Sequence, residues 1–103
     1  MSERPDPRKL REIARFVASE NTQNVLFTNH ALDQMEARDI PDVTVYRVLR
    51  KGHIKGDPEP GKNKGEWKIK ICDEVRGRRE VGVVTIVNTE TLVILTVEWE
   101  DLT

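Results

Sequence analysis

The chain has little cysteine, few aromatic residues and no long apolar run. Its single cysteine, Cys72, cannot form an intrachain disulfide or supply a zinc site built from several thiolates. No apolar stretch approaches the roughly 20 residues of a membrane-spanning helix. The first residues also lack the basic-then-apolar pattern of a secretory signal. We therefore expect a cytoplasmic protein that makes no contact with a membrane and is held together by packing alone.

Charged residues are plentiful, but neither sign dominates. They make up 34% of the chain, and 17 cations against 18 anions leave a formal charge of -1. This composition is typical of a solvated globular protein rather than of a disordered polyelectrolyte. The 103 residues suit one domain, since a typical domain has roughly 100–150. The sequence therefore predicts a single domain over residues 1–103 with one modest core.

Apolar residues at helical spacing predict three helices in the first half of the chain. Two of them cover residues 7–19 and 30–38, and the third starts after Pro41. Asp39 suits the left-handed end of the second helix because its short polar side chain tolerates that conformation. Gly52 stands where a C′ glycine is expected after the third helix.

The second half of the chain carries the alternating pattern of strands. Trp67–Cys72 predicts a strand with one buried face, and Val81–Val87 is nearly apolar on both faces, as a central strand is. Leu92–Trp99 follows after a short turn, which favours an antiparallel meander. Val25–Phe27 is either a strand fragment or a buried linker, and 57–65 predicts an exposed loop. The fold class is therefore α+β, with about three N-terminal helices packed on one face of a mostly antiparallel three- to four-stranded sheet.

The second predicted helix holds the first candidate site. At 100° per residue, His30, Gln34 and Arg38 lie within an arc of about 80° that flanks the apolar stripe. A histidine can transfer a proton near neutral pH, and an arginine can hold a phosphate through two hydrogen bonds. These residues predict the edge of a functional groove. The alternative is that His30 is an ordinary boundary residue at a helix start.

Cations concentrate in the middle of the chain. The segment from Arg47 to Arg79 contains eleven Lys and Arg residues but five Asp and Glu residues. Lys68 and Lys70 share the non-core face of one predicted strand, so they predict an anion-binding surface together with the turn at Arg78-Arg79. The alternative is that these cations only solvate the sheet and protect its edge.

Metal and cofactor chemistry has no support in the spacing of residues. His30, His53 and Cys72 form no ligand pair such as two histidines four residues apart. The glycines at 61 and 65 lack the strand and helix that flank a phosphate-binding loop. The sequence therefore predicts no metal site and no cofactor.

One string of residues carries a family resemblance. It consists of Phe27-Thr28-Asn29-His30-Ala31, Met35, Arg38-Asp39-Ile40, Val45, Val48-Leu49 and Gly52, and later of Ile94-Leu95-Thr96-Val97. The chain resembles the bacterial domain-of-unknown-function family 4258 over about residues 25–99. Residues 1–24 then form a helical extension. In place of the arginine that precedes the family's methionine, this chain has Gln34.

The resemblance implies a fold and an activity. The family is similar to the barnase, colicin, RelE and MqsR-like group of small ribonuclease toxins. The resemblance thus implies a metal-independent endoribonuclease of a bacterial toxin-antitoxin system, with RNA as its substrate and an antitoxin protein as its partner. The family's histidine and helix arginine fall on His30 and Arg38.

These roles complete the set of predicted site residues. In metal-independent cleavage the 2′-hydroxyl attacks the phosphate, so the protein supplies a base, an acid and cations. We expect His30 to act as acid or base, Arg38 to face the phosphate and Thr96 to orient a group from the sheet. The predicted RNA phosphate holders are Lys68, Lys70, Arg78 and Arg79.

A non-catalytic protein- or RNA-binding module is the alternative function. The end of the chain, Glu98-Trp99-Glu100-Asp101, sets one aromatic residue among three anions. Such a segment suits a basic partner protein better than it suits a polyanion.

Overall fold

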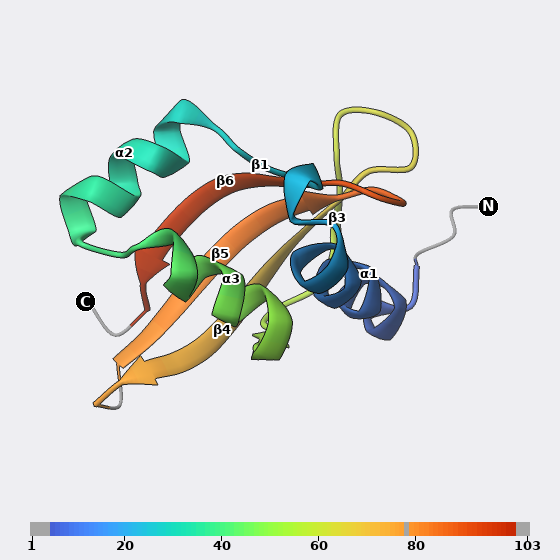
Figure 1. Cartoon of the computed structure of the whole chain (residues 1–103). Helices are drawn as coiled ribbons and strands as arrows, with labels where there is room; N and C mark the ends of the chain where they lie inside the picture. Colours follow the sequence, from blue (N-terminus) through green and yellow to red (C-terminus); the bar gives the residue numbers. More distant parts are fainter. Residues whose placement is uncertain (1–4, 78, 101–103) are drawn as a thin grey trace.

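Three helices lie against one six-stranded sheet in the computed structural model, which describes residues 5–77 and 79–100 (Figure 1). The helices are α1 (Pro7–Glu20), α2 (Asn29–Arg38) and α3 (Asp42–Lys51), with a short 3₁₀ turn at Thr22–Asn24. The strands are β1 (Val25–Phe27), β2 (His53–Ile54), β3 (Glu59–Pro60), β4 (Trp67–Arg76), β5 (Arg79–Val87) and β6 (Leu92–Trp99). The α+β class predicted from the sequence is confirmed. No helix in the described part of the chain has the length and apolar character needed to cross a membrane.

The strands are ordered β1-β6-β5-β4-β2 across the sheet, and β3 also pairs with β4. β1 runs parallel to β6, and the other pairs are antiparallel. The sheet is thus mixed and larger than the predicted three or four strands. The extra strands are two or three residues long, which is too short for a visible alternating pattern. Val25–Phe27 is a strand, which settles the alternative left open by its sequence.

The core lies between the helices and the sheet face they cover. Ile69 and Ile71 of β4 and Val83 of β5 point into it and are fully or almost fully buried. β5 is an inner strand, as predicted, since it pairs with β4 on one side and β6 on the other. Its residues Val84 and Ile86 lie on the opposite face and are half-buried. No described helix covers that face, which we call the outer face.

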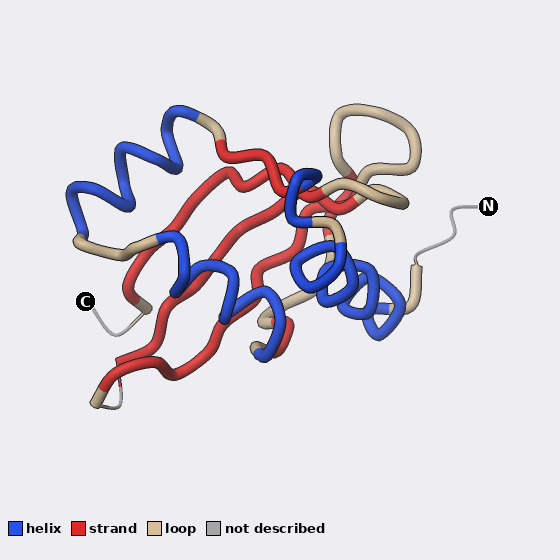
Figure 2. The backbone as a smooth tube through the Cα atoms, viewed as in Figure 1, coloured by secondary structure: helices blue, strands red, loops and turns tan. Residues whose placement is uncertain are grey.

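Local sequence explains where the helices begin and end. Asp6 caps α1, accepting a hydrogen bond from the Arg8 backbone N–H at 2.9 Å. Thr28 caps α2 in the same way, since its Oγ1 accepts a hydrogen bond from the Ala31 backbone N–H. Asp39 ends α2 in the left-handed conformation with φ of 56°, as predicted. The loop between β3 and β4 extends away from the sheet (Figure 2).

Gly52 ends α3 for a different reason from the one predicted. Its φ of -75° is ordinary for any residue, so it is not a left-handed C′ glycine. A Cβ at this position would instead collide with the carbonyl oxygens of Cys72 and Val48. Glycine is needed because the end of α3 approaches the backbone of β4 closely.

Candidate functional site

The side of β6 that faces away from β5 is completed by α2. β1 pairs with β6 only as far as Ile94. Beyond that point, the Val97 N–H donates to Oε1 of Gln34 at 2.9 Å, and the Val97 carbonyl accepts from Nη1 of Arg38 at 3.0 Å. Nε1 of Trp99 donates to the Arg38 carbonyl at 3.0 Å. Gln34 and Arg38 of α2 therefore supply hydrogen bonds to the part of β6 that has no neighbouring strand on this side.

A pocket of about 310 Å³ opens where this edge meets the start of α3 and the β4–β5 hairpin. Three arginines line it, each from a different element: Arg38 from α2, Arg47 from α3 and Arg79 from β5. We call this set the arginine pocket. Its remaining wall residues are Asp39, Ile40, Pro41, Thr44, Val75 and Trp99.

Aromatic and acidic neighbours position two of the arginines. The guanidinium of Arg79 lies 3.9 Å from the centroid of the Trp99 ring, a cation–π contact. Nε of Arg47 lies 3.8 Å from Oδ2 of Asp73, and about half of the Arg47 side chain stays exposed (53%). Guanidinium groups keep their charge at any physiological pH and present several donors in one plane. The arginine pocket can therefore receive an anion with several oxygens, such as a phosphate.

His30 lies away from this pocket. It is exposed near the start of α2, and Arg38 stands eight residues further along the same helix. At 1.5 Å per residue, the two backbones are roughly 12 Å apart. The structure therefore does not bring His30 and Arg38 to one phosphate.

The predicted phosphate holders divide between the two faces of the sheet. Lys68 and Lys70 lie on the outer face, as expected, whereas Arg79 lies beside Trp99 on the helix side. Nζ of Lys68 lies 3.3 Å from Oε1 of Glu59. Nζ of Lys70 lies 3.0 Å from Oε2 of Glu98 and 2.7 Å from Oε2 of Glu100. The lysines thus have anions of the chain itself as partners. Arg78 lies outside the described residues.

Thr96 also belongs to the outer face. The pairing of β5 with β6 shifts between Val84 and Thr85, so that Leu95 is the extra residue of a bulge. Thr96 is thereby placed opposite Val84, half-buried and on the face away from the arginine pocket. Its side chain therefore lies on the other face of the sheet from Arg38, which donates to the carbonyl of the next residue, Val97.

A second polar cluster lies on the outer face, where Gly82 leaves room for it. A Cβ on Gly82 would collide with Oε2 of Glu100 and with the Lys70 stem. The Glu100 carboxylate lies in this space with its side chain only 8% exposed, and it also pairs with Nζ of Lys55 at 3.2 Å. Burial raises the pKa of Glu100, but hydrogen bonds from Lys70 and Lys55 outweigh it, so the pKa is lowered overall.

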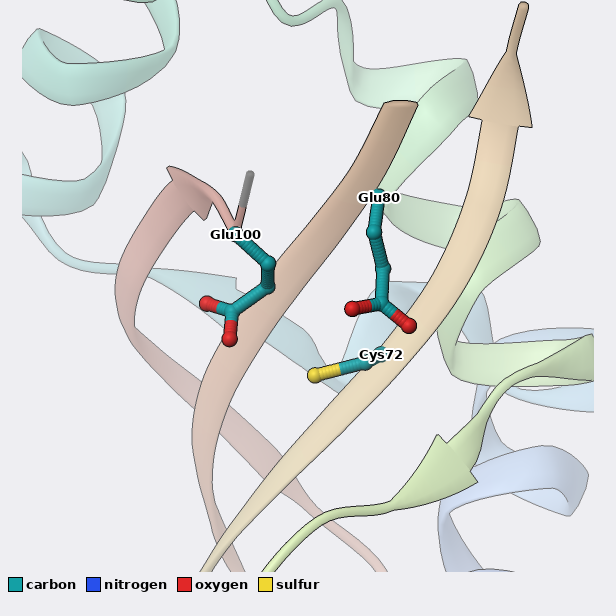
Figure 3. Close-up of side chains that lie close together, drawn as sticks. All are labelled: Cys72, Glu80 and Glu100. Atoms are coloured by element: carbon teal, nitrogen blue, oxygen red, sulfur yellow. The ribbon is translucent and has the colours of Figure 1, made fainter. Parts of the chain in front are cut away.

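Cys72 and Glu80 flank Glu100 in this cluster (Figure 3). Their ligand atoms lie within 4.8 Å of one another. Burial, followed by the charges of Glu100 and Glu80, raises the pKa of the Cys72 thiol to about 11. The thiol is therefore protonated at neutral pH and is a poor metal ligand. Lys55 and Lys70 already supply the positive charge that these carboxylates need.

The acidic residues near the end of the chain have partners within the chain. Glu98 and Glu100 pair with lysines of the outer face, and Trp99 packs against the core. Asp101 lies outside the described residues. The described part of this segment thus offers little free negative charge for a basic partner protein.

Sequence reasoning missed Arg47 and Trp99 as site residues. Arg47 was visible only as one cation in a basic stretch, and Trp99 only as an aromatic residue near the end of the chain. The residue type of each was visible in the sequence, but the spacing along the chain gave no reason to group either residue with Arg38. Only the packing of α3 and β6 against the end of α2 does so.

The comparison with protein families gives one match. The sequence model of a domain of unknown function, DUF4258, matches residues 27–99. The matched segment contains α2, α3 and the whole arginine pocket but not α1. The chain matches no curated protein and no solved structure.

Proposed function

The chain belongs to the DUF4258 family, a domain of unknown function, and from its arginine pocket we propose that it binds RNA through the phosphodiester backbone. One observation carries the proposal: three guanidinium groups from α2, α3 and β5 line one pocket. Arginine is favoured where a phosphate must be held by several hydrogen bonds at once. We favour RNA as the polyanion because the resemblance to family 4258 implies a grouping with the small ribonuclease toxins.

Each arginine has support that keeps it at the pocket. Arg38 is anchored to the Val97 carbonyl through Nη1, which leaves its other nitrogens for an anion. Arg79 lies over Trp99, and Trp99 is itself fixed to the end of α2. Groups that are held in place before a ligand arrives lose little freedom when they bind it.

Cleavage of the bound RNA is the second part of the proposal. A charge that develops on a phosphorane in the pocket would face three fixed cations. Asp39 supplies a carboxylate at the same place that can take the proton of the 2′-hydroxyl and return it to the leaving 5′-oxygen, and the Thr44 hydroxyl can donate a hydrogen bond to the phosphate. The backbones of His30 and Arg38 are about 12 Å apart, so His30 can act as acid or base only on RNA that is bound at the start of α2. A cognate antitoxin protein that blocks this surface belongs to the same proposal.

Binding of a labelled single-stranded RNA over a range of salt concentrations tests the function. For the wild-type protein we expect log Kd to change linearly with log salt. Arg47→Gln combined with Arg79→Gln should reduce that slope by about 1.4, since each lost phosphate contact removes about 0.7 for a single strand. Lys64→Gln, which removes a cation from the exposed loop, is the control.

Two results would contradict the proposal. One is a wild-type protein that fails to bind RNA even at low salt. The other is an unchanged slope in the Arg47→Gln/Arg79→Gln protein when its thermal unfolding shows that it is folded.

A further inference from the structure

The helix that precedes the family domain, α1, carries a second group of arginines. Arg8, Arg11 and Arg15 lie within about 60° of arc at 3.6 residues per turn. Together with Glu12 they line a shallow pocket of about 260 Å³. Arg8 and Arg15 are exposed and Arg11 is half-buried. This face of α1 borders the buried stripe formed by Leu10, Ala14, Val17 and Ala18.

Two contacts connect this arginine face to α3 and the pocket. Nε of Arg15 donates to the carbonyl oxygen of Arg50 at 3.2 Å, at the end of α3. Asp73 of β4 forms an ion pair with Arg47 and also interacts electrostatically with Arg11. Asp73 therefore lies near both an arginine of the pocket and an arginine of α1. α1 packs beside α3 (Figure 1), and Arg47 of α3 lines the arginine pocket.

The positive charges of Arg11 and Arg15 lie close enough to affect each other, whereas Arg8 pairs with Asp6. Burial, followed by the positive charge of Arg15, lowers the pKa of Arg11, and Asp73 offsets this only in part. Two arginines held near each other repel, and a bound anion relieves that repulsion. The lysines of the outer face differ, because Lys70 already has two carboxylate partners at 3.0 Å or less.

We propose that an RNA strand held in the arginine pocket continues past Arg47 onto α1, where Arg11 and Arg15 bind its next phosphates. The inference rests on the proposed function and names its substrate: a single strand several nucleotides long rather than a mononucleotide or dinucleotide. A linear polyanion fits this arrangement because the cations follow one another from β5 through α3 to α1. α1 lies outside the matched family segment.

RNAs of two lengths separate this inference from the proposed function. We would measure the binding of a trinucleotide and of a dodecamer with the same base composition. Arg11→Gln combined with Arg15→Gln should lower the salt slope for the dodecamer by about 1.4, at about 0.7 per contact. The same variant should bind the trinucleotide as the wild type does. Arg47→Gln combined with Arg79→Gln should weaken the binding of both.

Lys9→Gln is the matched control because it removes one cation from the same helix. Lys9 is exposed and lies about 160° around α1 from Arg11. The Lys9→Gln protein should bind the trinucleotide and the dodecamer as the wild type does. Thermal unfolding of each variant shows whether the fold is kept.

The possible failures point to different conclusions. If the Arg11→Gln/Arg15→Gln protein binds the dodecamer with a wild-type salt slope, the proposed continuation of the RNA onto α1 is wrong, whereas binding in the arginine pocket is not contradicted. The continuation is equally wrong if Lys9→Gln reduces the salt slope per removed charge as much as the arginine variant does. If the wild-type protein binds neither RNA, both the proposed function and its extension fall.

Discussion

Gln34 accepts a hydrogen bond from the backbone N–H of Val97 at 2.9 Å. Together with Arg38, it lets α2 supply the hydrogen bonds that a neighbouring strand would otherwise make to the second half of β6. An arginine at position 34, which the resemblance implies, could not accept this hydrogen bond.

Replacing Gln34 should destabilise the protein measurably. Gln34→Ala leaves the N–H of the buried residue Val97 without its acceptor, which costs about 1–3 kcal/mol. Gln34→Glu keeps an acceptor at the same place and should cost less. The free energy of unfolding from urea titrations is the measurement, and Asp33→Ala, at an exposed neighbouring position, is the control. Equal stability of Gln34→Ala and Asp33→Ala would show that this hydrogen bond contributes nothing.

Two glycines should differ in their tolerance of alanine. A Cβ on Gly52 meets backbone carbonyls and the Ile71 side chain, none of which can move without distorting α3 or β4. A Cβ on Gly82 meets only the ends of the Glu100 and Lys70 side chains, which can swing away. We expect Gly52→Ala to cost about 3 kcal/mol and Gly82→Ala about 1 kcal/mol. Urea unfolding of both variants checks the order, and the reverse order would contradict the packing described.

The loss in Gly82→Ala should come from the displaced carboxylate of Glu100. The effect of Gly82→Ala should therefore shrink when Glu100 is already replaced by alanine. A double-mutant cycle measures this non-additivity. Fully additive effects would mean that Glu100 does not occupy the space above Gly82 in solution.

The pairing of Glu100 with Lys55 and Lys70 makes stability depend on pH. Because the pKa of Glu100 is lower in the folded state than its ordinary value of 4.5, its contribution is complete above that value and is lost as the pH falls through the folded-state pKa. Burial lowers the pKa of Lys70, but the hydrogen bonds that Lys70 donates to Glu100 and Glu98 raise it overall. The contribution of Lys70 is therefore complete below its ordinary pKa and is lost as the pH rises through the folded-state value.

A comparison of wild type with Glu100→Gln tests this dependence. We expect wild type to be more stable near neutral pH and the two free energies of unfolding to converge at strongly acidic pH. A difference that stays constant from acid to neutral pH would rule out an ionic contribution from Glu100.

RNA cleavage in the presence of a chelator tests the catalytic roles. A residue that acts as base or acid contributes about 10²–10⁴-fold to the rate. His30→Ala should therefore lose that factor if His30 acts on the substrate, while stability changes by less than about 0.5 kcal/mol because the side chain is exposed. Asp39→Asn, which keeps the left-handed backbone acceptable, should show the loss instead if the proton acceptor lies in the arginine pocket. Undiminished cleavage in both variants would exclude both residues, and an inactive wild type would leave RNA binding as the function.

The local patterns of the sequence were sufficient for most of the secondary structure. Helix spacing, the cap at Asp6, the left-handed end at Asp39 and the alternation of Trp67–Cys72 depend on residues a few positions apart. Such short-range preferences act in the same way in any context that buries the apolar face. They also placed Lys68 and Lys70 together on one face of the sheet.

Only the tertiary structure decided which charged groups meet. The parallel pairing of β1 with β6 ends at Ile94, and this leaves Val97 for Gln34 and Arg38. The bulge at Leu95 moves Thr96 to the outer face, away from Arg38.

By itself, the sequence determined the elements and the residue types available for anion binding, because periodicity and capping are local. It could not assemble Arg38, Arg47 and Arg79 or pair Lys70 with Glu98 and Glu100. Those contacts join residues far apart in the chain, and they form only when the helices and the sheet bury their apolar faces against one another.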